Sequence, residues 1–203
     1  MTTTPRALRR TVLLVAALNC GYFFVEFTVA LAIGSVSLMA DSVDFLEDTA
    51  VNLLVFASLG WSLAARARVG RLMALVILAP AAAAVWQAVA KAGDPSAPDL
   101  LSLVLTAGGA VAVNAVAAWL LVRVRQHGGS MGHAAWVAAR NDVVINILIL
   151  VMAAVTALVG TGWPDLLLGV VIVLLNGRAA YEVWELAEEE RLAAKALAGE
   201  ALD

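Results

Sequence analysis

Residues 34–52 read GSVSLMADSVDFLEDTAVN, and long apolar stretches flank them on both sides. The turn-forming segment 34–37 separates two apolar runs, and the second run carries several acidic residues. Asp44 and Asp48 are four residues apart, so a helix of 3.6 residues per turn carries both carboxylates on one face, with Asp41 one turn earlier. The stretch therefore predicts a helix that can present two carboxylates to one ion.

The composition indicates a membrane protein. Of the 203 residues, 63% are hydrophobic and 14% are charged, whereas about a quarter of the residues in a soluble domain are charged. The net charge of −3 excludes a basic face that would bind nucleic acid nonspecifically. The single cysteine, Cys20, excludes a disulfide framework and a thiolate-rich metal cluster. Any chemistry must therefore use oxygen or nitrogen ligands.

Six apolar runs approach the length of about 20 residues that a helix needs to cross a bilayer. They cover residues 12–33, 38–65, 72–89, 100–122, 134–160 and 166–187. If the helices alternate in direction, most cations fall on one side, namely Arg6, Arg9, Arg10, Arg66, Arg68, Arg71, Arg123 and Arg125. This pattern predicts an all-α membrane protein with six transmembrane helices and both termini in the cytoplasm.

The predicted organisation has three parts. Residues 1–11 form a cytoplasmic N-terminus, residues 12–187 a six-helix transmembrane transport domain, and residues 188–203 a short acidic cytoplasmic tail that we expect to be helical. We expect a multi-pass protein of the cell inner (plasma) membrane, because the arginines mark the cytoplasmic side of such a protein.

Polar residues within the predicted spans carry the functional information, because an ionised side chain in hydrocarbon costs at least about 2.5 kcal/mol. Asp142 and Asn146 form a stripe on the fifth span, and Asn19 and Glu26 form another on the first. With a rise of about 1.5 Å per residue, Asp142 lies about 14 Å into the bilayer, in the same layer as the aspartates of the second span. Transport is favoured, and a buried polar network that only fixes helix packing is the alternative.

The sequence leaves the roles of two further acidic residues open. Asp41 lies near the predicted outer boundary, where a helix-start or solvent-facing role and a gating role are both compatible with the sequence. Glu47 lies off the aspartate stripe and is expected either to snorkel or to hydrogen bond between helices.

Converging carboxylates repel and desolvate one another, so we expect protons on the predicted site when it holds no metal. A divalent cation would displace those protons, because carboxylate ligands must be deprotonated before they bind a metal. The same residues therefore provide a physical basis for exchanging a metal ion against protons.

These residues resemble the motifs of the cation diffusion facilitator family of metal efflux transporters. The resemblance extends over residues 10–187, and it is carried by Asn19, Glu26, the run from Gly34 through Asp48, and Arg140-Asn141-Asp142 through Asn146. It implies a six-helix domain and a four-ligand cation site on the second and fifth helices. By position, that site falls on Asp44, Asp48, Asp142 and Ala138.

The sequence departs from the family pattern at Ala138, where the family usually has His or Asp. Water, Asn141 or Asn146 are candidates to fill the gap. An oxygen-only site would favour harder ions such as manganese, with zinc and cobalt still possible. The family's cytoplasmic domain is not expected in this short form, so a homodimer follows from the resemblance alone.

The resemblance and the residues together predict efflux of a divalent metal cation by alternating access, coupled to protons. The ion is zinc or a related ion such as cobalt, cadmium, manganese or iron, and no permanently bound cofactor is expected. The expected partners are the lipid bilayer, the metal ion and a second copy of the chain. The predicted metal ligands are Asp44, Asp48, Asp142 and Asn146, and the predicted pathway or proton-relay residues are Asn19, Glu26, Asp41 and Asn141.

The main alternative is a non-transporting regulatory or assembly subunit that retains the fold with an incomplete metal site. An enzyme is not expected, because no serine, histidine or cysteine is paired with the carboxylates at a usable spacing.

Overall fold

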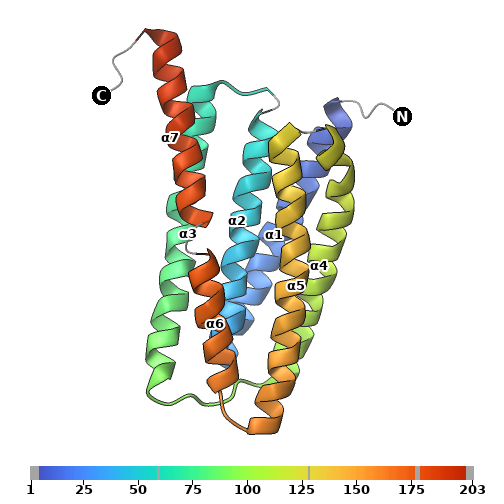
Figure 1. Ribbon diagram of the computed structural model, residues 1–203, viewed down its shortest axis with the longest axis vertical. Coiled ribbons are helices and arrows are strands. Elements are labelled where there is room, and N and C mark those ends of the chain that lie inside the picture. Colours follow the sequence, from blue (N-terminus) through green and yellow to red (C-terminus); the bar gives the residue numbers. More distant parts are fainter. Residues whose placement is uncertain (1–4, 59, 128, 177–178, 200–203) are drawn as a thin grey trace.

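The computed structural model describes residues 5–58, 60–127, 129–176 and 179–199, and helices are the only regular secondary structure in them. The helices pack side by side in one elongated bundle (Figure 1). They are α1 Pro5–Ile33, α2 Val36–Ser58, α3 Leu63–Ala92, α4 Leu100–His127, α5 Gly129–Val159, α6 Trp163–Asn176 and α7 Ala179–Ala198. The prediction of an all-α fold is confirmed.

Four of the described helices are long and apolar enough to cross a membrane. The qualifying segments are Ala7–Ile33, Leu63–Ala92, Leu100–Val122 and Ala138–Val159, and a shorter apolar helix covers Trp163–Leu175. Large apolar side chains remain exposed on the outside of this bundle, among them Trp86, Trp119 and Leu158. Such side chains are stable in contact with lipid, so the chain is a multi-pass membrane protein.

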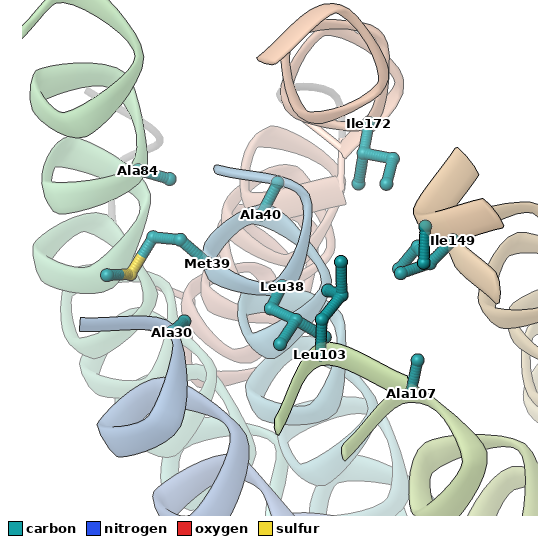
Figure 2. Close-up of a cluster of buried hydrophobic side chains, with 10 residues drawn as sticks. Ala30, Leu38, Met39, Ala40, Ala84, Leu103, Ala107, Ile149 and Ile172 are labelled. Atoms are coloured by element: carbon teal, nitrogen blue, oxygen red, sulfur yellow. The ribbon is translucent and has the colours of Figure 1, made fainter. Parts of the chain in front are cut away.

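Helix α2 is the centre of the bundle. It contacts α1, α3, α5 and α6, with a smaller contact to α7. Most of its described side chains are buried, among them those of Asp41, Glu47 and Asp48. Leu38, Met39 and Ala40 from its first turns join a buried apolar cluster (Figure 2). The neighbouring helices therefore shield most of α2, with its acidic residues, from lipid.

The boundary between the second and third helices differs from the prediction. The sequence suggested spans at residues 38–65 and 72–89, whereas α2 ends at Ser58 and α3 begins at Leu63. Ser62 is the N-cap of α3, and its side chain accepts a hydrogen bond from the backbone N–H of Ala65. The hydrophobic pattern missed this cap because apolar residues continue on both sides of it.

The predicted sixth span, residues 166–187, corresponds to α6 and the first half of α7. Helix α7 then continues through the acidic segment to Ala198, so that segment is helical as expected. The membrane boundary expected near residue 188 stays a prediction.

The first turns of α1 and α3 and the last turns of α7 lie at one end of the bundle (Figure 1). We call this end the arginine-rich end, because the described residues there include Arg9, Arg10, Arg68, Arg71 and Arg191. The turn between α1 and α2 lies at the opposite end, where Gly34 has a φ of 66° that favours glycine.

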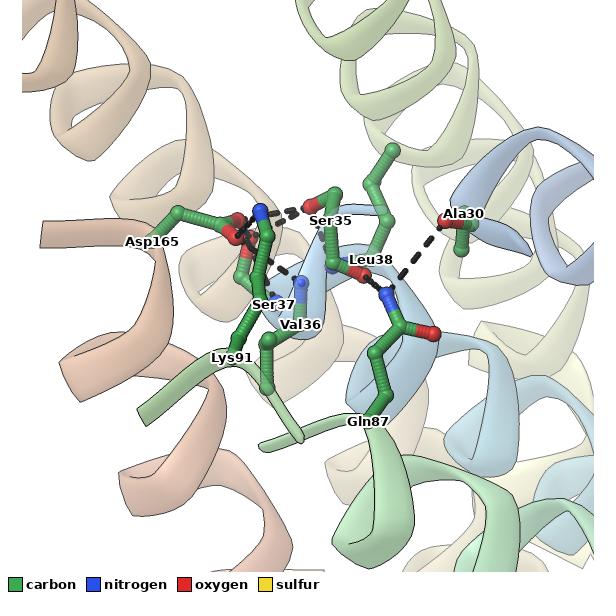
Figure 3. A network of polar contacts seen from close by, with 8 residues as sticks. All are labelled: Ala30, Ser35, Val36, Ser37, Leu38, Gln87, Lys91 and Asp165. Atoms are coloured by element: carbon green, nitrogen blue, oxygen red, sulfur yellow. Dashed lines mark hydrogen bonds and ion pairs between the residues drawn. The ribbon is translucent and has the colours of Figure 1, made fainter. Parts of the chain in front are cut away.

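Asp165, in the first turn of α6, organises the opposite end (Figure 3). Its carboxylate accepts hydrogen bonds from the hydroxyl groups of Ser35 and Ser37, both at 2.6 Å. It also accepts from the backbone N–H groups of Val36 at 2.8 Å and Ser37 at 3.3 Å. Lys91 Nζ, at the end of α3, lies 3.9 Å from the same carboxylate.

This carboxylate joins three helices at one point. It neutralises the positive end of the α2 dipole and satisfies N–H groups that have no partner within the helix. Gln87 of α3 extends the network by donating to the backbone oxygen of Ser35 at 2.9 Å. The role of Asp165 was not predicted from the sequence, because its hydrogen-bond partners are 128 to 130 residues away in the chain.

Replacing Asp165 by Asn should lower the free energy of unfolding by about 2 to 3 kcal/mol, because a buried charge paired with several donors becomes a neutral amide. Asp99→Asn is a matched control, since Asp99 is exposed and accepts one backbone hydrogen bond, from Ser102 at 2.9 Å. Chemical denaturation in detergent micelles would measure both. Equal effects in the two variants would contradict the role given to Asp165.

Candidate metal-binding site

Buried polar side chains from α1, α2 and α5 form two layers inside the bundle. Helix α2 supplies an acidic residue to each layer, because Asp41 and Asp48 are two turns apart on it. Helix α1 faces it with Asn19 and Glu26, which have the same spacing. Helix α5 completes the layers with Asp142, which is half-buried, and Asn146, which is fully buried.

The first layer contains Asp48, Asp142 and Asn19, and we call it the Asp48 layer. Asn19 Nδ2 donates to Asp48 Oδ2 at 3.0 Å, and Asn19 is fully buried. The carboxyl groups of Asp48 and Asp142 interact electrostatically across the contact of α2 with α5. Because an ionised carboxylate is only an acceptor, two such groups side by side repel each other unless a proton or a cation lies between them.

The second layer contains Asp41, Glu26 and Asn146, and we call it the Asp41 layer. Asn146 Nδ2 donates to Asp41 Oδ1 at 3.3 Å, and all three side chains are fully buried. The carboxyl groups of Glu26 and Asp41 interact electrostatically. Here too a proton or a cation between the two groups would relieve their repulsion. The prediction that Asp41 could be a helix-start or solvent-facing residue is wrong, because helices α1 and α5 cover it.

Several acceptor oxygens in these layers receive no N–H or O–H donor from the described residues. They include Asn19 Oδ1 in the Asp48 layer, and both Glu26 oxygens, Asp41 Oδ2 and Asn146 Oδ1 in the Asp41 layer. A buried acceptor without a partner costs about 1 to 3 kcal/mol, so native interiors contain few of them. A row of such oxygens is suited to bind cations or protons.

Two more acidic residues of α2 lie beside the layers. Asp44 is half-buried and acts electrostatically on Glu26. Glu47 is buried and acts electrostatically on Asp142. The sequence did not assign Glu47 to the site because it lies off the aspartate stripe, and its burial contradicts the snorkelling alternative.

Two predicted positions lie apart from the oxygen layers. Asn141 is exposed, and its Oδ1 accepts a hydrogen bond from Arg140 at 3.4 Å. Ala138 lies one helical turn from Asp142 and has no ligand atom. Among the residues that the structure describes, no group of three or more His, Cys, Asp or Glu residues is arranged as a metal site. Each layer instead offers two carboxyl groups and one amide.

The family model of the cation efflux transmembrane domain matches most of the chain, over residues 12–189. No curated protein matches the chain.

Substitutions of Asp41 can separate the contribution of hydrogen bonding to stability from the contribution of charge. In Asp41→Asn, the new amide can accept from Asn146 and donate to Glu26, so the free energy of unfolding should stay within about 1 kcal/mol of wild type. Asp41→Leu leaves both neighbours without a partner and should lower it by about 2 to 4 kcal/mol. Denaturation in detergent would measure both. An equal loss in the two variants would show that this network does not stabilise the fold.

Proposed function

Because the chain belongs to the cation efflux family by the match over residues 12–189, we propose that it exports a divalent metal cation in exchange for protons. The family consists of cation transporters. For this chain we propose the identity of the ion, its coupling to protons and the residues that bind it. We place the chain in the cell inner (plasma) membrane, with the arginine-rich end on the cytoplasmic side.

The observation that carries the proposal is the set of buried acceptor oxygens between α1, α2 and α5. Buried carboxyl groups in hydrocarbon are stable only with a proton, a cation or a donor. The amides of Asn19 and Asn146 each donate to one carboxylate, yet they keep an oxygen without a donor. Such amides can assist both a carboxylate and a bound metal.

Metal and protons compete in this mechanism for the same oxygens. A proton held between Asp48 and Asp142 has to leave before both can bind one cation. A divalent ion then compensates the two negative charges. When the ion leaves on the other side of the membrane, protons return to the carboxylates and neutralise the empty pair. The buried site is not stable with bare carboxylates, and it is not stable with a metal ion and protons together. The metal ion and the protons therefore replace each other.

We assign direct binding to Asp44, Asp48 and Asp142, with Asn146 as a further oxygen ligand. Asn19, Glu26 and Asp41 are assigned to the proton pathway, since Asp41 and Glu26 interact electrostatically in a second layer toward the opposite end. The ligand set contains oxygen only, which favours hard ions such as manganese. Zinc, cobalt, cadmium and iron remain substrates within the proposal.

Opening at each end in turn requires the helices around the site to separate there. At the opposite end, the hydrogen bonds of Asp165 connect α2 to α6, and Lys91 adds α3. We propose that these bonds break when the site opens at that end and form again when it closes. A homodimer is proposed from the family alone.

A non-transporting subunit is the alternative, and Ala138 is the residue that favours it. Ala138 contributes no ligand where the family usually has one, so the site could bind a metal without releasing it across the membrane. Binding without flux would distinguish this function from transport.

Asp48→Asn and Asp142→Asn should each reduce metal flux into proteoliposomes with an imposed pH gradient by at least about tenfold, because each removes one carboxylate from the shared pair. Zinc, manganese, cobalt and cadmium would be compared. Asp99→Asn is the control, since Asp99 is exposed and lies outside both layers. Undiminished flux in both site variants would contradict the assignment. Metal binding to the folded wild type without flux would favour the non-transporting subunit.

Ala138→His should shift the preference of the transporter from manganese toward zinc and cobalt, because it adds an imidazole nitrogen one turn from Asp142. The shift would be measured as the ratio of zinc to manganese flux from an equimolar mixture. Ala138→Leu adds bulk without a nitrogen and serves as the control. An unchanged ratio in Ala138→His, in protein that still transports, would show that this position is not beside the bound metal.

A further inference from the structure

Helices α3 and α7 pack closely at the arginine-rich end. A Cβ on Gly70 would lie 2.7 Å from the Cβ of Ala187, so only glycine permits this approach. Glu188 connects the helices further, because its Oε2 lies 2.7 Å from Arg71 Nη2 and its Oε1 accepts from Arg191 Nε at 2.8 Å. The bonds with Arg191 and Arg71 lower the pKa of Glu188 to about 2, so this carboxylate is ionised at neutral pH.

A cavity of about 300 Å³ lies between the same two helices. Four basic residues line it, Arg68 and Arg71 from α3 and Arg191 and Lys195 from α7, and the other lining residues are alanines. The small alanine side chains leave the space open, and the basic side chains determine its charge. None of its lining residues is acidic.

Two arginines of this cavity share one carboxylate. Glu188 is the carboxylate bonded to Arg71 and Arg191, and it contributes one negative charge to the two of them. Arg71 Nε is buried and donates to no described residue. The Nε of Arg68 donates to the backbone oxygen of Ala64 at 3.3 Å, which orients the side chain without neutralising it. An anion with several acceptor oxygens fits this set of donors.

An open apolar groove adjoins the cavity. Its volume is about 280 Å³, and it is lined by Trp61, Ala65, Arg68, Val69 and Leu72. Arg68 lines both spaces, so the groove meets the basic cavity at this residue. Trp61 and Leu72 are exposed, as expected for side chains that contact lipid near the membrane surface.

We propose that this cavity binds the phosphate group of an anionic phospholipid, with an acyl chain of the same lipid in the adjoining groove. Free phosphate shares the chemistry of the headgroup but has nothing to occupy the groove. The apolar groove beside the basic cavity is therefore the feature that favours the lipid. The site lies at the α3–α7 interface, and it is independent of the proposed transport of metal.

Binding of phosphatidylglycerol to the full chain in detergent, measured by native mass spectrometry, tests the proposal. The double variant Arg68→Gln with Lys195→Gln should weaken binding at least about tenfold, because two cations that face the headgroup are lost. Arg10→Gln, an exposed arginine on α1 at the same end, should bind as wild type does. The charge-conserving double variant Arg68→Lys with Lys195→Arg should also retain binding, which separates a loss of charge from a loss of folding.

Two comparisons distinguish the sources of the phosphate. Phosphatidylcholine should bind at least about tenfold more weakly than phosphatidylglycerol, because its headgroup has no net negative charge. Inorganic phosphate at millimolar concentration should not displace the lipid. Displacement would overturn the assignment to a lipid in favour of free phosphate. Equal binding of phosphatidylglycerol to wild type and the double glutamine variant would overturn the site itself.

Discussion

A carboxyl group in the hydrocarbon core of a membrane needs a partner other than lipid, and α2 carries four acidic residues within eight positions. The remaining architecture follows from this constraint. Helices α1, α3, α5 and α6 surround α2, and they expose their own apolar side chains to the lipid instead. The polar residues of α1 and α5 lie on the helix faces that contact α2, where they can donate hydrogen bonds to its carboxyl groups. The candidate site is thus a consequence of how this helix is kept out of lipid.

Asp165 and Glu26 show how one chemical group performs two functions in one bundle. Asp165 accepts four hydrogen bonds and has a lysine nearby, so its charge is fully used in holding helices together. Glu26 is equally buried, yet the described residues give it no N–H or O–H donor, and the carboxyl groups of Asp41 and Asp44 act on it electrostatically. The satisfied carboxylate is structural. The unsatisfied one is suited to a mobile charge, whether a proton or a metal ion.

The sequence predicted most of the candidate site, because side chains four or seven residues apart share a helix face. That rule brought Asp48, Asp142 and Asn19 into one proposal, and the structure brings them together. It failed for Asp165, which has no polar residue four or seven positions further along its helix to form a stripe with, and for a cap within an apolar pattern. The contacts of Asp165 span more than a hundred residues, and the Ser62 cap lies within a continuous apolar pattern. Periodicity alone also could not assign the burial of Asp41.

The two-residue connection between α1 and α2 has a consequence for how the protein enters the membrane. Only Gly34 and Ser35 separate these helices. Helix α2 is not among the described helices that are apolar enough to qualify as membrane spans. During synthesis, α2 leaves the ribosome before α3, α5 and α6, which later shield it. Its earliest partner is α1, which already offers the amide of Asn19 to Asp48. We therefore expect the insertion machinery to receive α1 and α2 as a single helical hairpin, because α2 alone is a poor substrate for it.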